Sequence, residues 1–289
     1  MPAQRFSFDH YLATIGASNF ALGLFSVIYP WLIIGVLQES PSRLGLAQMA
    51  LLLPNLLFIL PGGVVSDRSH RGFWLSLLYI LYLLPIGILA SAILTDQLSF
   101  SLLLICGMTF GTVSAFVQPT RESLLGYAAP NLMHQAVAKV VMVQFIAQGI
   151  GFAAAGQMVS TGITLLLSLQ MVAFVASSFL IKRSHPRPSR SHEEAVKLRQ
   201  PLTELREGLQ LFIDNKALLH LVILTFATGA LAFGVYLVGM PLIAKQAYGG
   251  GAQLYAGMQV MFTLGVISAN FGVMKRDKMF NRPGRLIII

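Results

Sequence analysis

The chain has 289 residues, of which 55% are hydrophobic and only 11% are charged, and its formal net charge is +9. A mean hydropathy of +0.72 excludes a soluble domain, because so few polar residues could not cover its surface. The basic residues lie in short loops rather than on one face, so the positive charge does not indicate a nucleic-acid partner. The single cysteine, Cys106, permits no intrachain disulfide.

Long uncharged runs follow one another along the chain, each with the roughly 20 apolar residues that a membrane helix needs. Only helices and closed barrels satisfy their backbone in lipid, and these runs lack the alternation of barrel strands. The sequence therefore predicts an all-α, polytopic transmembrane helical bundle. Its eight helices should cover residues 10–37, 42–66, 72–94, 98–118 and 131–160, then a sixth that follows a turn at 160–162 and ends at 181, and finally 216–244 and 252–274.

The loops carry the signal for orientation. All lysines and arginines except Arg43 and Lys245 fall on alternate loops. Positively charged loops stay on the cytoplasmic side of a membrane. The amino terminus and the long middle loop are therefore predicted to be cytoplasmic, and no part of the first helix is predicted to be removed as a signal peptide.

Residues 183–215 form a hydrophilic segment between two apolar parts. They contain Pro186, Pro188 and Pro201 and many charged residues, which no bilayer core would accept. Leucines and a phenylalanine recur at helical spacing over residues 202–212, which fits an amphipathic helix or a solvated connector with a packing stripe. We therefore expect a six-helix part over residues 1–182, a cytoplasmic linker over 183–215, and a third part over 216–289 with two helices and, at residues 286–289, the start of a ninth.

The loop between the second and third helices contains the most specific motif. Residues 63–71 read Gly-Val-Val-Ser-Asp-Arg-Ser-His-Arg, which resembles the signature loop of the major facilitator superfamily, with His70 in place of the usual glycine. The resemblance implies a conformational latch, a breakable charge network at the membrane surface. It would consist of Gly63, Asp67, Arg68, Arg71 and Arg121, with Asp67 paired to Arg121 or to an adjacent loop arginine.

Two further stretches extend the resemblance. Residues 118–125, Gln-Pro-Thr-Arg-Glu-Ser-Leu-Leu, and the glycines at 151 and 156 look like the exporter branch that includes enterobactin and macrolide efflux carriers, with Phe152 replacing a proline of that branch. Residues 272–285 partly repeat the 63–71 motif, as expected for two related halves. Carriers of this family have twelve helices, so the resemblance implies that this chain is truncated after about eight.

The family's substrate cavity lies near the membrane midplane, lined by helices 1, 4, 7 and 10 with contributions from 2, 5, 8 and 11. Gln144 and Gln148 are the best pair, because four-residue spacing puts both amides on one helical face. Hydrogen bonding between helices without any ligand is an equally good explanation for them. The candidate cavity residues are Asn19, Asn55, Thr109, Thr112, Gln144, Gln148, Tyr236 and Gln259.

No aspartate or glutamate lies within a predicted membrane core, and the nearest are at helix ends. Proton relays usually need such a buried acid, so the coupling ion stays open. No metal spacing, Ser-His-Asp pattern or phosphate loop occurs, so neither enzyme activity nor a cofactor is expected. The resemblance implies an exporter in a bacterial inner membrane, and the uncharged candidate cavity residues favour small apolar or amphipathic molecules as its substrate, so a small-molecule substrate and the lipid bilayer are its expected partners. The alternative is a non-transporting sensor or scaffold whose basic loop recruits partners.

Overall fold

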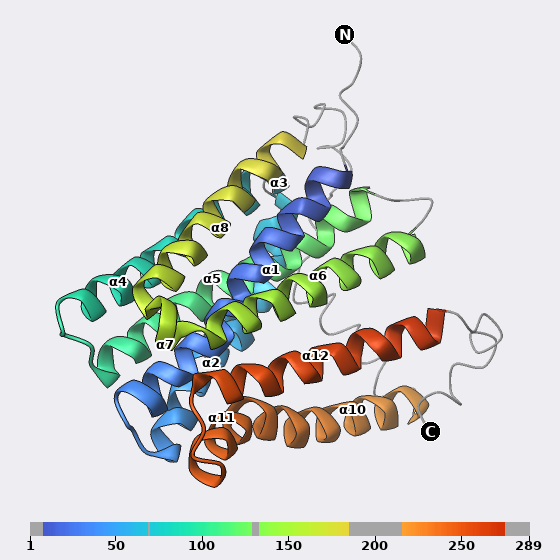
Figure 1. Ribbon diagram of the computed structural model, residues 1–289. Coiled ribbons are helices and arrows are strands. Elements are labelled where there is room, and N and C mark those ends of the chain that lie inside the picture. The colour runs from blue at the N-terminus through green and yellow to red at the C-terminus, as the bar shows by residue number, and fades with distance from the viewer. Residues whose placement is uncertain (1–7, 69, 129–132, 185–215, 275–289) are drawn as a thin grey trace.

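The computed structural model describes residues 8–68, 70–128, 133–184 and 216–274 (Figure 1), and within these ranges every element is a helix. The predicted all-α bundle is confirmed. The amphipathic helix expected over 202–212 and the ninth helix expected from 286 lie outside the described residues.

The first six predicted helices appear as α1 to α8. The bounds are α1 Phe8–Trp31 with a π-helical turn η1 Leu32–Val36, α2 Pro41–Arg68, α3 Arg71–Leu81, α4 Leu83–Leu94, α5 Phe100–Ala128, α6 Met133–Gly156, α7 Met158–Thr161 and α8 Ile163–Ser184. The seventh predicted helix consists of α10 Lys216–Gly234, η3 Val235–Gly239, α11 Met240–Leu242 and η4 Ile243–Ala247, and the eighth is α12 Ala252–Met274.

Seven helical spans among the described residues are long and apolar enough to cross a membrane, where the sequence predicts eight. They are Phe8–Val36, Arg71–Leu94, Phe100–Gly126, Ala136–Gly156, Ile163–Arg183, Leu218–Ala247 and Ala252–Ala269. The predicted helix over 42–66 is the one that is not among these seven spans. It is present as α2, although the structure does not describe all of its side chains.

Several predicted helices differ in detail from the observed ones, among them the one predicted over 131–160, which is divided into α6 and α7 at Gln157. The helix predicted over 72–94 is divided into α3 and α4 at Tyr82. Pro85 explains the division, because it has no N–H to donate to the Leu81 carbonyl four residues earlier. The helix predicted to end at residue 118 continues to Ala128 with Pro119 inside it, because charged residues do not end a helix that has reached the membrane surface.

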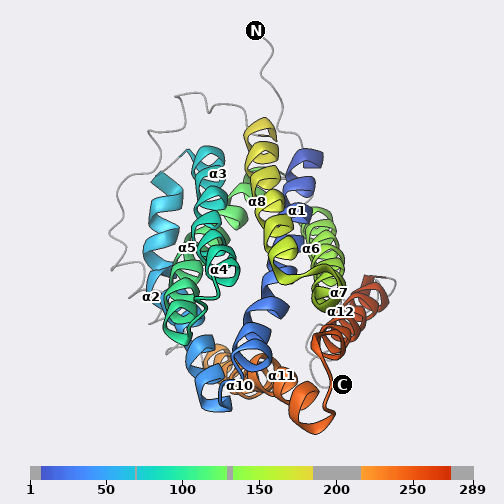
Figure 2. The same ribbon diagram turned by 60° about the vertical axis from the view of Figure 1, so that its left-hand side comes forward.

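Helices α1 to α8 form one group around α1 (Figure 2). Helix α1 packs against α6 and α8, α2 lies along α5, and α3 contacts both α8 and α5. Tyr29 of α1 is buried here, and its hydroxyl shares its one proton between the Leu103 carbonyl at 3.1 Å and the Ala47 carbonyl at 3.3 Å. One side chain thus joins three separate helices.

Small residues bring the backbones of these helices together. Gly151 of α6 faces α1, and a Cβ there would collide with the Phe20 carbonyl oxygen and lie 3.0 Å from the Gly23 Cα. In the same way a Cβ on Gly111 of α5 would collide with the Leu51 carbonyl oxygen of α2. Glycine-mediated contact is a common way for membrane helices to associate, since it lets backbones approach closely.

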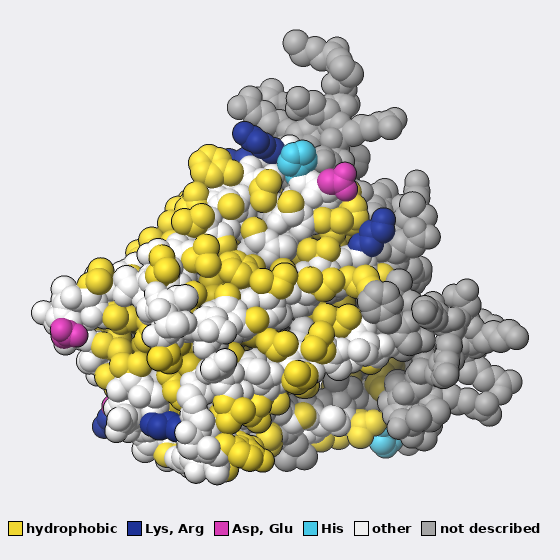
Figure 3. All heavy atoms as spheres, in the orientation of Figure 1, with side chains coloured by type: hydrophobic (Ala, Val, Ile, Leu, Met, Phe, Trp, Pro, Cys, Tyr) yellow, Lys and Arg dark blue, Asp and Glu magenta, His cyan; other side chains and the backbone are white. Residues whose placement is uncertain are grey.

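The α10 to α12 part is joined to α1–α8 mainly along one helix. Helix α12 packs on α6 and touches α1, while η3 contacts α2. Side chains also donate to backbone carbonyls across this junction: Gln48 to Leu237 at 3.3 Å, and Lys245 to Ile34. On the face seen in Figure 3, charged side chains lie toward the two ends of the helices and an uncharged band separates them, as expected for a membrane protein.

Candidate functional site

A hydrogen-bonded series of polar groups lies where α12 meets α1. The Tyr255 hydroxyl of α12 donates to the Ser26 carbonyl of α1 at 3.1 Å. One turn further along α12, Gln259 donates from Nε2 to the Tyr255 hydroxyl oxygen, also at 3.1 Å. Gln259 is only 2% exposed and its Oε1 has no hydrogen-bond partner among the described residues. A buried acceptor without a partner costs roughly 1–3 kcal/mol, so this atom is an unsatisfied polar group inside the helix bundle.

A cavity of about 650 Å³ opens next to this series, between α10, η3 and α12. Tyr236 of η3 is half-buried in its wall, with its ring centroid 4.9 Å from that of Phe262 on α12. The Tyr236 hydroxyl lies near the Gln259 side chain. The lining is otherwise almost wholly apolar: Ala227, Thr228, Ala232, Val235, Met240 and Phe262. The structure therefore brings one predicted cavity residue, Tyr236, to the wall of this apolar cavity, while Gln259 is buried near the Tyr236 hydroxyl and is not among the lining residues.

The predicted pair Gln144 and Gln148 lies on α6, on the side between its two helical neighbours. Gly151 faces α1, whereas Gly149 lies against Thr263 of α12. Each residue of a helix is rotated by 100° from the one before it. Measured around α6 from Gly151, Gln148 is therefore about 60° toward the side that faces α12, and Gln144 is about 20° in the same direction. Both amides are half-buried, so they occupy the wedge between α1 and α12.

Asn19 of α1 is buried and donates from its Nδ2 to the Ile15 carbonyl of its own helix at 2.8 Å. Asn55 of α2 is half-buried, and its Oδ1 has no hydrogen-bond partner among the described residues. It lies two turns after Gln48, on the same side of α2, and Gln48 contacts η3. Neither asparagine is joined by a hydrogen bond to the Tyr255 and Gln259 series in the described part of the chain.

The two threonines of α5 lie elsewhere. Their hydroxyls donate to carbonyls of their own helix, Thr109 to Ile105 and Thr112 to Met108, each at 2.8 Å. Thr112 lies about 200° around α5 from Phe110, whose ring stacks on Phe25 of α1 at 3.7 Å. Thr112 therefore lies on the same side of α5 as Ile105, which is 62% exposed. The structure does not bring these threonines to the cavity.

The residues of the predicted latch are described only in part. The side chains of Asp67 and Arg68 lie outside the described ones, so their pairing with Arg121 stays a prediction. Gly63 has open space around its Cα, and a Cβ there would meet nothing within 4 Å. Arg121 is half-buried, its carbonyl accepts a hydrogen bond from Tyr11 at 2.9 Å, and Arg71 begins α3.

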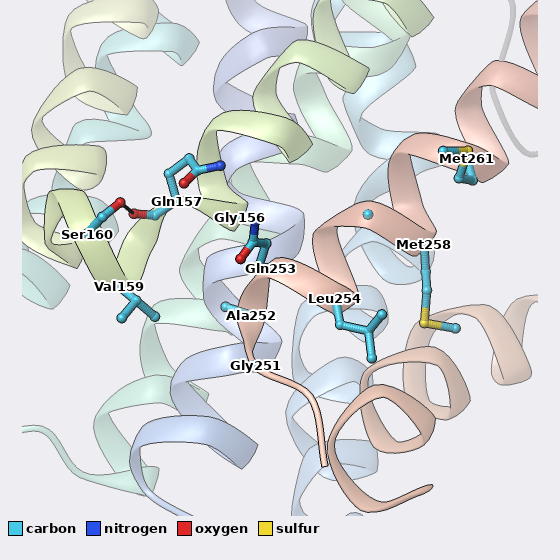
Figure 4. A pocket seen from close by; sticks show the side chains of 11 residues that line it. Gly156, Gln157, Val159, Ser160, Gly251, Ala252, Gln253, Leu254, Met258 and Met261 are labelled. Atoms are coloured by element: carbon cyan, nitrogen blue, oxygen red, sulfur yellow. Dashed lines mark hydrogen bonds between the residues drawn. The ribbon is translucent and has the colours of Figure 1, made fainter. Parts of the chain in front are cut away.

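A second cavity of about 970 Å³ lies at the other edge of α12, against α6 and α7. Figure 4 shows Gln157, Val159 and Ser160 on one side of it and the beginning of α12 on the other. The Ser160 hydroxyl donates to the Gln157 carbonyl at 2.9 Å. Val159 is 84% exposed here, and Val235 in the wall of the first cavity is 64% exposed, so both hollows are open at the surface.

Charged and metal-binding side chains are sparse in the described part of the chain. No group of three or more metal-binding side chains occurs within the described ranges. The one ion pair among the described side chains joins Glu39, in the loop before α2, and Arg43, in the first turn of α2, at 2.6 Å. The described acids Asp9, Asp96 and Glu122 lie near helix ends, so the cavity is lined without a carboxylate.

Sequence reasoning missed three residues of this region: Ser26, Tyr255 and Phe262. Ser26 contributes only its backbone carbonyl, which no side-chain pattern reveals. The spacing of Tyr255, Gln259 and Thr263 at four-residue intervals was available as a signal, since such residues share one face of a helix. All three are buried, as that face requires.

Comparison with known proteins adds one result. Residues 12–289 match the sequence model of the Major Facilitator Superfamily. No curated protein matches the sequence.

Proposed function

The chain belongs to the major facilitator superfamily, a family of membrane transporters, and from this we propose that it exports small apolar or amphipathic molecules by alternating access. The observation that carries the substrate class is the cavity between α10, η3 and α12. It pairs an apolar lining with the aromatic rings of Tyr236 and Phe262 and has no charged side chain in its wall. Pockets of this kind hold largely apolar ligands and orient them through few polar groups.

The direction of transport rests on likeness to an exporter branch. The segment with Pro119 and Arg121 lies within α5, and the glycines at 151 and 156 lie on α6. Both stretches resemble those of enterobactin and macrolide efflux carriers. The distribution of basic loops supports a cytoplasmic amino terminus, and the branch resemblance supports a bacterial inner membrane. The division into residues 1–182, 183–215 and 216–289 belongs to the same proposal.

A charge latch between Asp67 and Arg121 is part of this mechanism. Gly62 of α2 lies against α5, where a Cβ on it would be 2.7 Å from the Ala115 carbonyl oxygen and 3.4 Å from the Phe116 Cα. Five residues further along these two helices are Asp67 and Arg121. Because α2 and α5 run side by side in the same direction, Asp67 and Arg121 would lie at similar heights along them. An ion pair between them would contribute on the order of 1 kcal/mol if partly exposed.

Transport into everted membrane vesicles tests the proposal. Vesicles containing the chain should accumulate a fluorescent, uncharged aromatic dye against its gradient. Phe262→Ala should lower the rate several-fold, because it removes one ring of the cavity wall. Phe179→Ala is the matched control, since Phe179 is 62% exposed on α8. Uptake restricted to small ions or strongly charged metabolites would contradict the proposed substrate class.

A further inference from the structure

Two π-helical turns occupy equivalent places in the two parts of the chain. Turn η1 at Leu32–Val36 and turn η4 at Ile243–Ala247 are separated by 211 residues. The same interval relates the residues of positive φ that follow them, Gln38 at 54° and Gly249 at 59°, and also the first residues of α2 and α12. Around these turns the backbone of the second part therefore repeats that of the first, residue by residue.

A proline precedes each of these turns at an equivalent position. Pro30 lies inside α1, and Pro241 lies inside α11. In an α-helix each carbonyl accepts a hydrogen bond from the N–H four residues later, and proline has no N–H to donate. The Ser26 and Leu237 carbonyls, four residues before the two prolines, are therefore left without their ordinary helical donor.

Each of these two carbonyls accepts a hydrogen bond from the other part of the chain. Gln48 of α2 donates to the Leu237 carbonyl at 3.3 Å. In the opposite direction, the Tyr255 hydroxyl of α12 donates to the Ser26 carbonyl at 3.1 Å. Gln259, which is the equivalent of Gln48, donates to that hydroxyl. Each part thus supplies a donor to the carbonyl that a proline frees in the other, where an unmade hydrogen bond would be costly within a membrane.

A third contact shows how these two bonds are related in space. Lys245 of η4 donates to the Ile34 carbonyl of η1, and these two residues are also equivalents, 211 positions apart. Equivalent residues meet where an approximate two-fold axis passes between them, and such an interface repeats its contacts on both sides of the axis. Figure 2 shows α11 beside the ends of α1 and α2, toward the predicted outer side. The two carbonyl bonds therefore hold the parts together at that end from both sides of the axis.

We propose that the two carbonyl bonds form an outer clamp, which keeps the predicted outer end of the bundle closed until both bonds break. The clamp consists of Ser26, Leu237, Gln48, Tyr255 and Gln259. This inference rests on the proposed function, because opening and closing of the outer end is one half of alternating access. The clamp is reversible, since its groups are neutral and water can replace the partner of each once the end opens. The prolines keep the acceptors available by removing the competing donor within each helix.

Pulsed electron resonance measures whether the outer end opens. Spin labels are attached to Ser40→Cys and Gly251→Cys, two equivalent exposed positions just before α2 and α12, in the full chain with Cys106→Ala, in lipid nanodiscs and without substrate. Gln48→Leu and Tyr255→Phe should each raise the ratio of long to short distances about threefold, as expected for one average hydrogen bond between membrane helices, and together about ninefold. An unchanged ratio in the double variant, or an effect of only one of the two changes, would overturn the inference.

Pro241→Ala tests the role of the prolines. Alanine restores an N–H that competes with Gln48 for the Leu237 carbonyl, so the ratio of long to short distances should again rise. Because Pro241→Ala and Gln48→Leu weaken the same bond, the second change should add little to the first, whereas the effects of Pro241→Ala and Tyr255→Phe should multiply. Pro30→Ala provides the counterpart, with the two donors exchanged. Equal multiplication in the double variants of one bond and of both bonds would overturn the inference.

Gln97→Leu is the matched control, because Gln97 is an exposed glutamine between α4 and α5 on the same predicted side, and it should leave the ratio unchanged. A threefold rise in this control as well would overturn the inference. Failure of this test is distinguishable from failure of the proposed function, since the distances are measured without substrate and without transport. Unchanged distances with active vesicle transport would reject the clamp alone, whereas the expected distances without transport would reject the export function alone.

Discussion

Two membrane spans with similar composition are packed in opposite ways. In the span Phe8–Val36 an 18-residue stretch with a mean hydropathy of 1.8 is 67% buried, whereas in Leu218–Ala247 a stretch of the same length with a mean hydropathy of 2.2 has no buried residue among those described. Hydropathy therefore predicts that a helix enters the membrane and does not predict what it packs against. In a bilayer, lipid is as apolar as leucine, so apolar composition gives no preference for a neighbouring helix.

What differs between the two spans is the fit of small residues. The first span contains Gly23, which lies against Gly151 of α6, while a Cβ added to Gly229 or Gly234 of α10 would meet nothing within 4 Å. The α10 to α12 part is instead connected by side chains that donate to backbone carbonyls, such as Gln48 to Leu237. Close backbone contact holds the first part, and single hydrogen bonds together with the packing of α12 on α6 hold the second.

The largest effect should come from filling a glycine contact. Gly151→Val would force atoms into the Phe20 carbonyl oxygen and the Gly23 Cα, and overpacking of this kind costs about 3 kcal/mol at the upper end of its range. The free energy of unfolding, measured by circular dichroism during detergent denaturation, should fall by that amount.

Gly265→Ala provides the matched control, because a Cβ at Gly265 of α12 would meet nothing within 4 Å. It should leave stability unchanged or raise it slightly, since alanine favours a helix over glycine. Equal losses for Gly151→Val and Gly265→Ala would show that the two parts do not differ in packing.

A smaller loss is expected at Tyr29. Tyr29→Phe keeps the ring and removes the hydrogen bonds to the Ala47 and Leu103 carbonyls. The free energy of unfolding should fall by about 1 kcal/mol, within the range of hydrogen bonds between membrane helices. A fall of more than about 3 kcal/mol would mean that the hydroxyl does more than join these helices.

The connection between the two parts should be weaker still. Gln48→Leu removes the donation to Leu237 of η3, and bonds between membrane helices average about 0.6 kcal/mol. The variant should increase the spread of distances between spin labels on α2 and η3 in pulsed electron resonance. An unchanged distance distribution would show that other contacts position η3.

The smallest effect is expected at the surface pair of Glu39 and Arg43. Arg43 has a half-exposed side chain, and pairs of this type contribute about 0–1 kcal/mol and are screened by salt. Glu39→Gln should change the free energy of unfolding by less than about 0.5 kcal/mol, and by nothing measurable at 1 M salt.

The sequence predicted the helices well and the cavity only partly, for separable reasons. Length and absence of charge define a membrane span, so the runs that became α1, α5 and α8 could be read directly. The division of the third helix followed from Pro85, which a hydropathy average does not register. Thr112 and Gln259 looked alike as polar residues within apolar runs, yet Thr112 lies on the side of α5 that carries the exposed Ile105, whereas Gln259 is buried in α12, because the rotation of each helix is set by packing.

The π-helical turn η1 at Leu32–Val36 affects how the chain tolerates changes in length. A π-turn holds one residue more per hydrogen-bonded ring than an α-turn. Deleting one residue here would let the backbone close into ordinary α-helical turns and leave the residues before it in place. The same deletion in the middle of α1 would rotate everything after it by about 100° and take Tyr29 away from the two carbonyls that it joins. Insertions and deletions in this first span are therefore expected to accumulate at its η1 end.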